Sequence, residues 1–362
     1  VKQRKRRNSI SVSLGDIEPV LFNATLTANP PVYADKHRDF DSTAGNIVRG
    51  IGSMDVSYSD DRLLFMALGD MWVQDGNDVP QNLDDGPGQI NDPTWSRDGE
   101  HIAFVAERDG QMDIWLRDME TEEETRLTND KNREYRISWS RDGRYIAYLS
   151  TRGVSNTWGR ANLNVIDAKY GNVHVIDEDI HTPGRPVWAM DGDHVILAVA
   201  DPASSRFREG THVIRRYNVE TKIFNNQEMP GGLGLSTRDG SGPVITDDGG
   251  KLAYISEGEV RVAYVNSAGE ITGTVENRCT DTAHMPRWAR NDETIYYMSG
   301  QNLKSCNYLS GETQRHNINL TWARARADDK TIHVEKVFDG VSDSYHENVD
   351  VFISGGRITK VV

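Results

Sequence analysis

Few side chains in this sequence have both the type and the spacing that catalysis requires. The two cysteines, Cys279 and Cys306, are too few for a zinc cluster built on thiolates. The pentapeptide Gly-x-Ser-x-Gly, which presents a serine nucleophile in one large class of hydrolases, does not occur. The glycine-rich segment 231–236 lacks the later glycine and the strand–turn–helix context of a nucleotide-binding loop, so we interpret it as a loop.

Pairs of adjacent carboxylates are the next candidates, because calcium prefers oxygen ligands. Their order does not match an EF-hand loop, and aspartate favours tight turns, so we interpret them as turn residues. The pairs are Asp60-Asp61, Asp84-Asp85, Asp247-Asp248 and Asp328-Asp329. Three further aspartates, Asp98, Asp142 and Asp191, each follow a tryptophan by three residues and are predicted to fix hairpin turns.

The composition is that of an acidic globular chain. Its 362 residues carry 41 Lys and Arg against 55 Asp and Glu, a net charge of −14, which argues against a nucleic-acid partner. Hydrophobic residues make up 37% of the chain and the mean hydropathy is −0.62. A transmembrane helix needs about 20 mostly apolar residues, so we expect no membrane span.

A short motif recurs along the chain and organises the rest of it. Residues 95–99 and 139–143 both spell Trp-Ser-Arg-Asp-Gly, and each is followed by an apolar run. Weaker copies start at Tyr58, Trp188, Ile245 and Trp288. Six units therefore follow one another at intervals of roughly 37 to 57 residues.

Each unit predicts four short strands. An Asp-Gly or Asp-Asp turn follows the anchor and suits a tight hairpin, and the next apolar run indicates a strand buried on both faces. Four strands per 40–45 residues or so is the period of a β-propeller. The recurring tryptophans are then expected to pack between neighbouring sheets rather than to form a sugar-binding platform.

The unit resembles the WD40-like repeat, PD40, of TolB-type six-bladed propellers. The resemblance covers roughly residues 51–322 and rests on Trp-Ser-Arg-Asp-Gly and the Ile-Ala-Phe, Asp-Ile-Trp and Leu-Thr that follow it. Arg97 and Arg141 stand where that family usually has Pro, whereas Pro93 and Pro286 match its entry into the innermost strand. The resemblance implies an all-β chain with a six-bladed β-propeller over residues 51–322.

A second resemblance lies in residues 323–362. Residues 332–340 and 348–361 resemble the opening strands of the β-sandwich that flanks the metal-dependent barrel of amidohydrolases. Independently of that family, residue alternation on both sides of Gly355-Gly356 predicts a β-hairpin. The combination resembles bacterial amidohydrolases that carry an N-terminal TolB-like propeller.

The metal site of that superfamily has no counterpart here. Its first barrel strand supplies His-x-His, and none of the ten histidines has that spacing. We therefore expect no catalytic or metal-binding residue in this chain. The resemblance implies that a barrel domain or a second chain holds zinc or another divalent metal and hydrolyses a C–N bond in an amide or peptide-like substrate.

Candidate ligand contacts lie near the long insertions between strands. They are Trp158, Arg160, Arg185, Arg206 and Arg208. Trp158 falls outside the repeat register, and a propeller gathers its loops on two faces, so these residues could line a channel mouth or face a partner. The alternative is that the arginines are ordinary solvated loop residues.

The first 50 residues precede the repeats and are expected to form an arm. Its one predicted strand, residues 18–27, would pair with the propeller rim or with the C-terminal hairpin. The basic cluster at residues 2–7 is not followed by the apolar core of a signal peptide. The resemblance to TolB-type propellers implies a periplasmic or secreted protein whose leader has been removed.

Cys279 and Cys306 both fall in or next to the last unit. Their spacing is compatible with a disulfide but does not imply one. Two free thiols are the expectation.

Two hypotheses for function follow. The first is that the chain is the accessory, substrate-gating propeller of a metal-dependent amidohydrolase; the second is a free-standing TolB-like module that binds a protein of the cell envelope. The C-terminal hairpin favours the first, because a free-standing propeller has no use for it. A propeller lectin is a third alternative, although its loops should repeat aromatic residues, and a homo-oligomer is compatible with each hypothesis.

Overall fold

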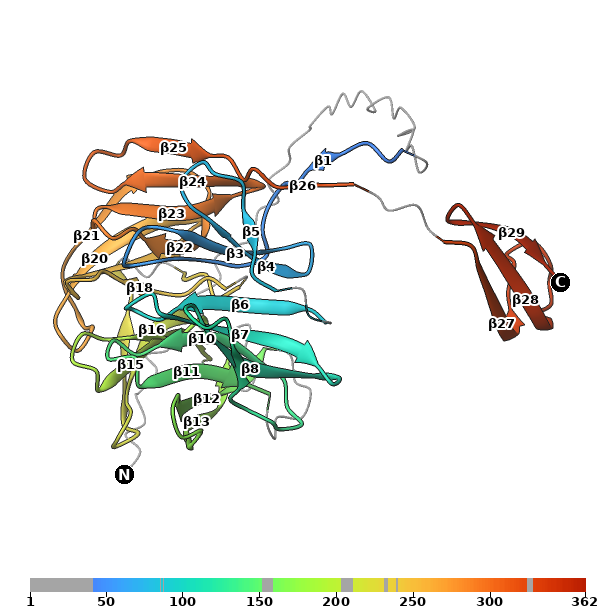
Figure 1. Ribbon diagram of the computed structural model, residues 1–362. Helices are drawn as coiled ribbons and strands as arrows, with labels where there is room; N and C mark the ends of the chain where they lie inside the picture. Colours follow the sequence, from blue (N-terminus) through green and yellow to red (C-terminus); the bar gives the residue numbers. More distant parts are fainter. Residues whose placement is uncertain are drawn as a thin grey trace, which may run out of the picture. The chain divides into compact units, whose positions relative to one another are not determined.

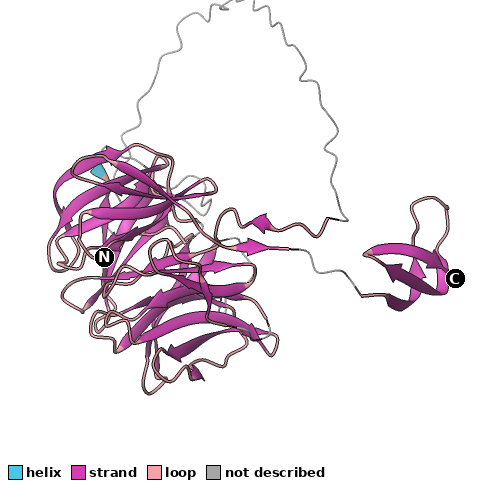
Figure 2. Cartoon of the chain, turned by 45° about the horizontal axis from the view of Figure 1, so that its top comes forward, coloured by secondary structure: helices cyan, strands magenta, loops and turns pink. Residues whose placement is uncertain are grey.

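The computed structural model describes residues 42–84, 86, 88–151, 159–202, 211–230, 234–238, 240–323 and 328–362. These fall into two compact units, residues 43–323 and residues 328–362. Strands and their connecting loops make up nearly all of the described chain (Figure 2). No described helix is long and apolar enough to cross a membrane.

The larger unit contains six four-stranded antiparallel sheets in its described residues, each built from strands consecutive in sequence (Figure 1). The first three sheets comprise β2 (Met54–Val56), β3 (Leu63–Ala67), β4 (Asp70–Gln74) and β5 (Gln81–Asn82); β6 (Ile90–Trp95), β7 (His101–Arg108), β8 (Gln111–Asp118) and β9 (Glu124–Arg126); and β10 (Glu134–Trp139), β11 (Tyr145–Ser150), β12 (Arg160–Asp167) and β13 (Val173–His181). The last three comprise β14 (Val187–Trp188), β15 (His194–Asp201), β16 (Thr211–Asn218) and β17 (Phe224–Glu228); β18 (Val244–Ile245), β19 (Lys251–Ser256), β20 (Glu259–Val265) and β21 (Ile271–Cys279); and β22 (His284–Trp288), β23 (Thr294–Ser299), β24 (Asn302–Asn307) and β25 (Thr313–His316).

The repeated turn closes the first hairpin of each sheet, as the sequence predicts. In the second sheet, the Ser96 backbone N–H donates to the His101 carbonyl at 2.8 Å, and the Asp98 carboxylate accepts from the Ser96 hydroxyl at 2.6 Å. Gly99 has φ +77°, a left-handed conformation in which a side chain is strained. Asp142 and Asp191 accept equivalent bonds from their own turns, so the predicted turn role is confirmed for all three aspartates.

The register predicted for the first unit is wrong by two residues. The Ser57 N–H donates to the Arg62 carbonyl at 2.9 Å, which is the bond that Ser96 makes in the second sheet. Val56 therefore occupies the tryptophan position and is buried there. Tyr58, which the sequence suggests as the anchor, lies in the turn instead. The error arose because Val56 lacks the aromatic ring that marks the other anchors.

The second strand of each sheet is buried on both faces, as its continuous apolar run predicts. In β15, Val195, Leu197 and Val199 pack with Leu149 and Leu163 of the third sheet, while the alternate residues pack against the fifth. Each sheet thus supplies the apolar partner that its neighbours need.

The anchor tryptophans lie between neighbouring sheets. The Trp188 indole N–H donates to the Ser138 carbonyl at 3.1 Å, and that of Trp288 donates to the Val244 carbonyl at 3.0 Å. Trp188 also packs in the core between the third and fourth sheets. The prediction of core packing between sheets is therefore confirmed for these two residues.

The sixth sheet packs against the first. The Arg290 backbone N–H donates to the Asp61 carboxylate and its side chain to the Ser59 carbonyl, both at 2.8 Å. In addition, β1 (Asn46–Ile47) pairs with β26 (Thr321–Trp322). The sequence placed Asn46 in the arm and Trp322 at the end of the repeats, and it predicted neither strand. The strand predicted at residues 18–27 lies outside the described residues.

A disulfide joins Cys279, the last residue of β21, to Cys306 in β24. The expectation of two free thiols is therefore wrong. Cys279 also belongs to the fifth sheet, so the bond ties two sheets together rather than closing a loop within one. Spacing in sequence could not reveal this, because the two strand ends meet only when the sheets pack.

The smaller unit is a three-stranded antiparallel sheet. It consists of β27 (Lys330–Val337), β28 (His346–Ser354) and β29 (Arg357–Val361), in that order. Gly355 and Gly356, with φ of +58° and +74°, form the turn between the last two strands, which confirms the predicted hairpin.

Candidate functional site

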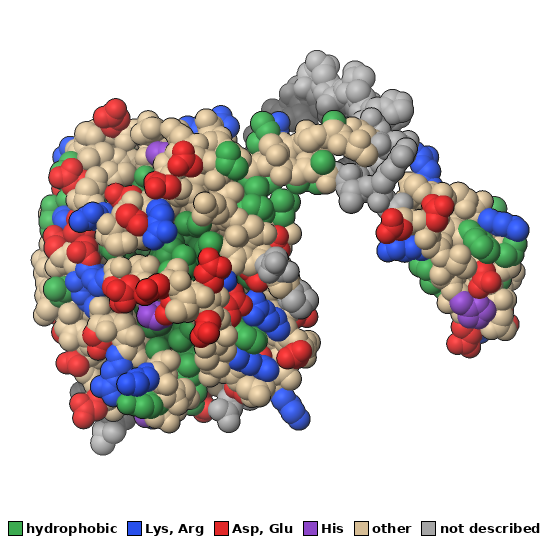
Figure 3. All heavy atoms as spheres, viewed as in Figure 1, with side chains coloured by type: hydrophobic (Ala, Val, Ile, Leu, Met, Phe, Trp, Pro, Cys, Tyr) green, Lys and Arg blue, Asp and Glu red, His purple; other side chains and the backbone are tan. Residues whose placement is uncertain are grey.

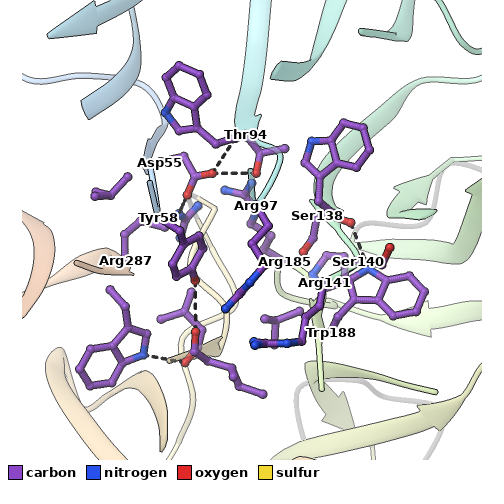
Figure 4. A pocket seen from close by; sticks show the side chains of 18 residues that line it. Asp55, Tyr58, Thr94, Arg97, Ser138, Ser140, Arg141, Arg185, Trp188 and Arg287 are labelled. Carbon is purple, nitrogen blue, oxygen red and sulfur yellow. Dashed lines mark hydrogen bonds and ion pairs between the residues drawn. The ribbon is translucent and has the colours of Figure 1, made fainter. Parts of the chain in front are cut away.

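A cavity of about 90 Å³ lies where the innermost strands of the six described sheets meet. Side chains from all of these strands point into it (Figure 4). The residue just before each anchor contributes to the wall: Asp55, Thr94, Ser138, Val187, Val244 and Arg287. The volume suits a few water molecules or one small polar group.

The cavity concentrates positive charge in an acidic protein. Arg97, Arg141, Arg185 and Arg287 line it, whereas Asp55 is the one lining carboxylate among the described residues. On the molecular face drawn in Figure 3, acidic and basic side chains are interspersed instead. The contrast is notable because the chain as a whole has a net charge of −14.

Asp55 is mostly buried, and both of its carboxylate oxygens have partners. Its Oδ2 accepts hydrogen bonds from the Thr94 hydroxyl at 2.7 Å and the Trp95 backbone N–H at 3.0 Å, and its Oδ1 lies 3.2 Å from Arg287 Nε. Burial raises the pKa of Asp55, and the nearby charge of Arg185 partly opposes the rise. Asp55 therefore links the first, second and sixth sheets.

Two arginines converge at one end of the cavity. Arg97 and Arg141 donate to the Asp247 backbone carbonyl at 3.0 and 2.6 Å, and Arg97 also forms an ion pair with the Asp247 carboxylate. The Arg97 guanidinium lies 5.0 Å from the centre of the Tyr58 ring, while the Tyr58 hydroxyl donates to the Ile245 carbonyl at 3.2 Å. Burial raises the pKa of Tyr58 to about 12, so this hydroxyl keeps its proton at neutral pH.

Arg185 and Arg287 are the most deeply buried of the four, each 5% exposed. Arg287 Nη1 donates to the Pro286 carbonyl at 2.6 Å, and its Nε faces Asp55. Arg185 Nε donates to the Ile137 carbonyl at 2.8 Å, but its Nη1 is enclosed without a hydrogen-bond partner among the described residues. A buried donor of this kind is costly unless something accepts its proton.

Of the residues predicted as ligand contacts, the structure describes Arg160 and Arg185, and these two lie in different places. Arg185 lies in the cavity wall, whereas Arg160 begins β12 and pairs with Asp179. Trp158, Arg206 and Arg208 lie outside the described residues. The alternative that Arg185 is an ordinary solvated arginine does not hold, since its side chain is buried.

Sequence analysis missed most of the cavity. Arg97 and Arg141 were noted only as residues that stand where the family usually has Pro, and no role was predicted for Asp55 or Arg287. The sequence did contain a signal for the cavity. Successive side chains of a strand point to opposite sides, so the residue just before each anchor points away from the anchor side chain. At that position, with the first anchor corrected to Val56, the sequence has Asp, Thr, Ser and Arg in four of the six units.

The described residues do not fit the zinc site that the amidohydrolase resemblance implies. Asp98, Glu100 and His101 are the one described group whose ligand atoms gather closely enough to hold a metal, and two of them are exposed. Asp98 already accepts hydrogen bonds from the Ser96 hydroxyl and the Glu100 N–H in the repeated turn. The group also contains a single histidine, so turn chemistry accounts for it.

Comparison with known families and structures supports the fold. The TolB beta propeller domain family, PD40, matches residues 71–229. No curated protein matches the chain.

Several solved structures are similar to this chain. A provisionally assigned TolB from Agrobacterium tumefaciens has a TM-score of 0.50 and 19% identity, over 63% of this chain and 80% of that one. TolB from Acinetobacter baumannii has a TM-score of 0.50 and 17% identity, over 73% and 62%. An oligogalacturonate lyase in complex with manganese has a TM-score of 0.53 and 15% identity, over 75% and 78%. At these identities the likeness shows the fold alone, an all-β TolB-like propeller.

Proposed function

We propose that this chain is the six-bladed propeller and the first sandwich strands of a metal-dependent amidohydrolase. The propeller would gate or shape access to a site that hydrolyses a C–N bond in an amide or peptide-like substrate. The observation that carries the proposal is the three-stranded sheet β27–β29, whose sequence resembles the start of an amidohydrolase β-sandwich and whose packing is incomplete.

One face of this sheet is apolar. Val351 in the central strand pairs with Ile332 of β27 and with Val361 of β29. Ile353 lies on the same face of the sheet as Val351 and pairs with Ile358 of β29. Val351 is 7% exposed, but Ile358 is 65% exposed and Ile332 is 47% exposed. Such a face gains stability when a second layer covers it. We infer that the remaining strands of an amidohydrolase sandwich form that layer.

The catalytic groups would come from a barrel domain or a second chain. Zinc, or another divalent metal, would there activate the water that attacks the substrate. The described residues of this chain hold no comparable ligand set, so their contribution would be to admit, orient or exclude substrate.

The test is the intact mass and metal content of the protein purified from its natural source. The proposal expects a species well above 40.6 kDa, or a co-purifying second chain, with one or two equivalents of zinc. A lone, metal-free chain of 40.6 kDa would overturn it.

A free-standing interaction module of the cell envelope is the second candidate. Its support is the TolB-like fold, since the TolB proteins are among the structures that the chain resembles. A periplasmic or secreted location fits both candidates, because the Cys279–Cys306 disulfide persists in oxidising compartments. Recovery of the disulfide-bonded protein in the cytoplasmic fraction would contradict that location.

A further inference from the structure

The central cavity contains a hydrogen-bond donor that the protein leaves unused. Arg185 extends from the segment before β14 and is anchored by its Nε bond to the Ile137 carbonyl. Its Nη1 is buried and has no partner among the described residues. Two of the other arginines, Arg97 and Arg141, donate hydrogen bonds to the Asp247 carbonyl.

The charges around the cavity do not balance. Against the four lining arginines stand three acidic groups: Asp55, Asp247 beside Arg97, and Asp292, whose charge acts on Arg97. Among these groups one positive charge remains when all three carboxylates are ionised, and the opposite charges of Asp248 and Lys251, which both act on Asp292, leave that difference unchanged. In a site of low dielectric, a single negative charge placed beside Arg185 would restore the balance.

We propose that the cavity binds one carboxylate group, with Arg185 Nη1 as its principal donor. A planar guanidinium and a planar carboxylate match in geometry, and the pair is stronger than a neutral hydrogen bond. The wall also contributes Val187 and Val244, which suit a short apolar stem next to the carboxylate.

Size and access favour a small group. The volume of about 90 Å³ suits a carboxylate with one or two carbons of its stem. The Arg97 side chain is 25% exposed, so solvent reaches the arginine-lined end of the cavity. The carboxylate could belong to a free short-chain acid or to an acidic side chain of a peptide. This inference does not depend on the proposed amidohydrolase activity.

Calorimetric titration of the full chain with propionate tests the proposal, with propionamide as the neutral isostere. We expect propionate to bind and propionamide to bind at least tenfold more weakly, because the guanidinium needs a charged acceptor. A short peptide with blocked termini and one internal Glu forms the second arm. Tighter binding of this peptide than of propionate assigns the site to a peptide, and tighter binding of propionate assigns it to a free acid.

Three variants locate the binding. Arg185→Met should weaken binding of the preferred ligand at least tenfold, whereas Arg160→Met, which changes an arginine outside the cavity, should leave it unchanged. Asp55→Asn keeps an acceptor for Thr94 and Trp95 but frees Arg287, so it should tighten binding. This second effect keeps the test decisive if Arg185→Met fails to fold.

Three outcomes would overturn the proposal. The first is that neither propionate nor the glutamyl peptide binds the unaltered protein. The second is binding that Arg185→Met and Asp55→Asn both leave unchanged, which would place the ligand elsewhere. The third is inorganic phosphate that binds more tightly than either carboxylate, which would make the site one for another class of anion.

Discussion

The sheets of the propeller and the sheet β27–β29 use similar strands to different effect. In β7, residues 102–106 are all at most 1% exposed, because apolar neighbours cover both faces of the sheet. In the terminal sheet, Val351 is the one hydrophobic residue that is buried. The difference lies partly in the strands, since residues 102–106 of β7 are an unbroken apolar run whereas polar residues alternate with Val349 and Val351 in β28, and partly in the neighbouring sheets. A propeller sheet is stabilised by the sheets on either side of it, whereas Ile332 and Ile358 of the terminal sheet are 47% and 65% exposed.

The largest contrast should appear when one large apolar side chain is removed from each region. Trp188→Ala should lower the free energy of unfolding by about 3–5 kcal/mol, because it opens a cavity between two sheets and leaves the Ser138 carbonyl without its donor. Ile332→Ala should cost less than about 0.5 kcal/mol, because its side chain is 47% exposed. Denaturant unfolding followed by circular dichroism measures both.

If Trp188→Ala and Ile332→Ala lowered the free energy of unfolding equally, the contrast between the propeller and the terminal sheet would be wrong. The change in the free energy of unfolding caused by Ile332→Ala also tests the proposed function. If the purified natural protein carries the covering layer, Ile332→Ala should there cost as much as an ordinary core truncation, about 2–5 kcal/mol.

The disulfide should give the next largest effect. Replacing Cys279 and Cys306 by serine should lower the stability of the propeller by about 2–4 kcal/mol, because the bond closes a loop of sequence separation 27 in the unfolded chain. A Ser305→Ala variant, next to Cys306 on the same strand, controls for local perturbation. If unfolding midpoints with and without reductant coincide, the cross-link contributes nothing.

Glu134 should make propeller stability depend on pH. It is fully buried, and burial raises its pKa from 4.5 to about 8; the Thr128 hydroxyl and the Ile114 N–H contact the carboxyl group. Between pH 4.5 and 8 the folded state then holds a proton that the unfolded state has lost. Stability from this group is therefore complete below pH 4.5 and falls as pH rises, by up to about 1.4 kcal/mol per pH unit.

The Glu134→Gln variant isolates this contribution. We expect the free energy of unfolding to fall less steeply between pH 5 and pH 8 in the variant than in the unaltered protein. Parallel slopes would show that Glu134 is ionised in the folded state, despite its burial.

A feature of this protein could be predicted from the sequence when the residues that form it are adjacent in the chain. The turn at Asp98 and Gly99 is fixed by four adjacent residues, and the buried run of β7 by its own apolar composition, so both were predictable. The Cys279–Cys306 bond and the cavity were not, because they join strand ends and side chains from different sheets. Arg185 entered the candidate list for its place near an insertion, and its unpaired Nη1 became visible only with the Ile137 carbonyl in position.

The smallest expected effect is that of removing the terminal sheet. The larger unit closes through its own contacts, with Arg290 bound to Asp61 and Ser59, and β1 paired with β26. None of these bonds involves residues 328–362, so deleting that range should change the free energy of unfolding of the propeller by less than about 0.5 kcal/mol. Differential scanning calorimetry of the shortened and full chains measures this. A loss comparable to that of Trp188→Ala would mean that the sheet is part of the propeller's core, and the exposed face of β27–β29 would then need another explanation.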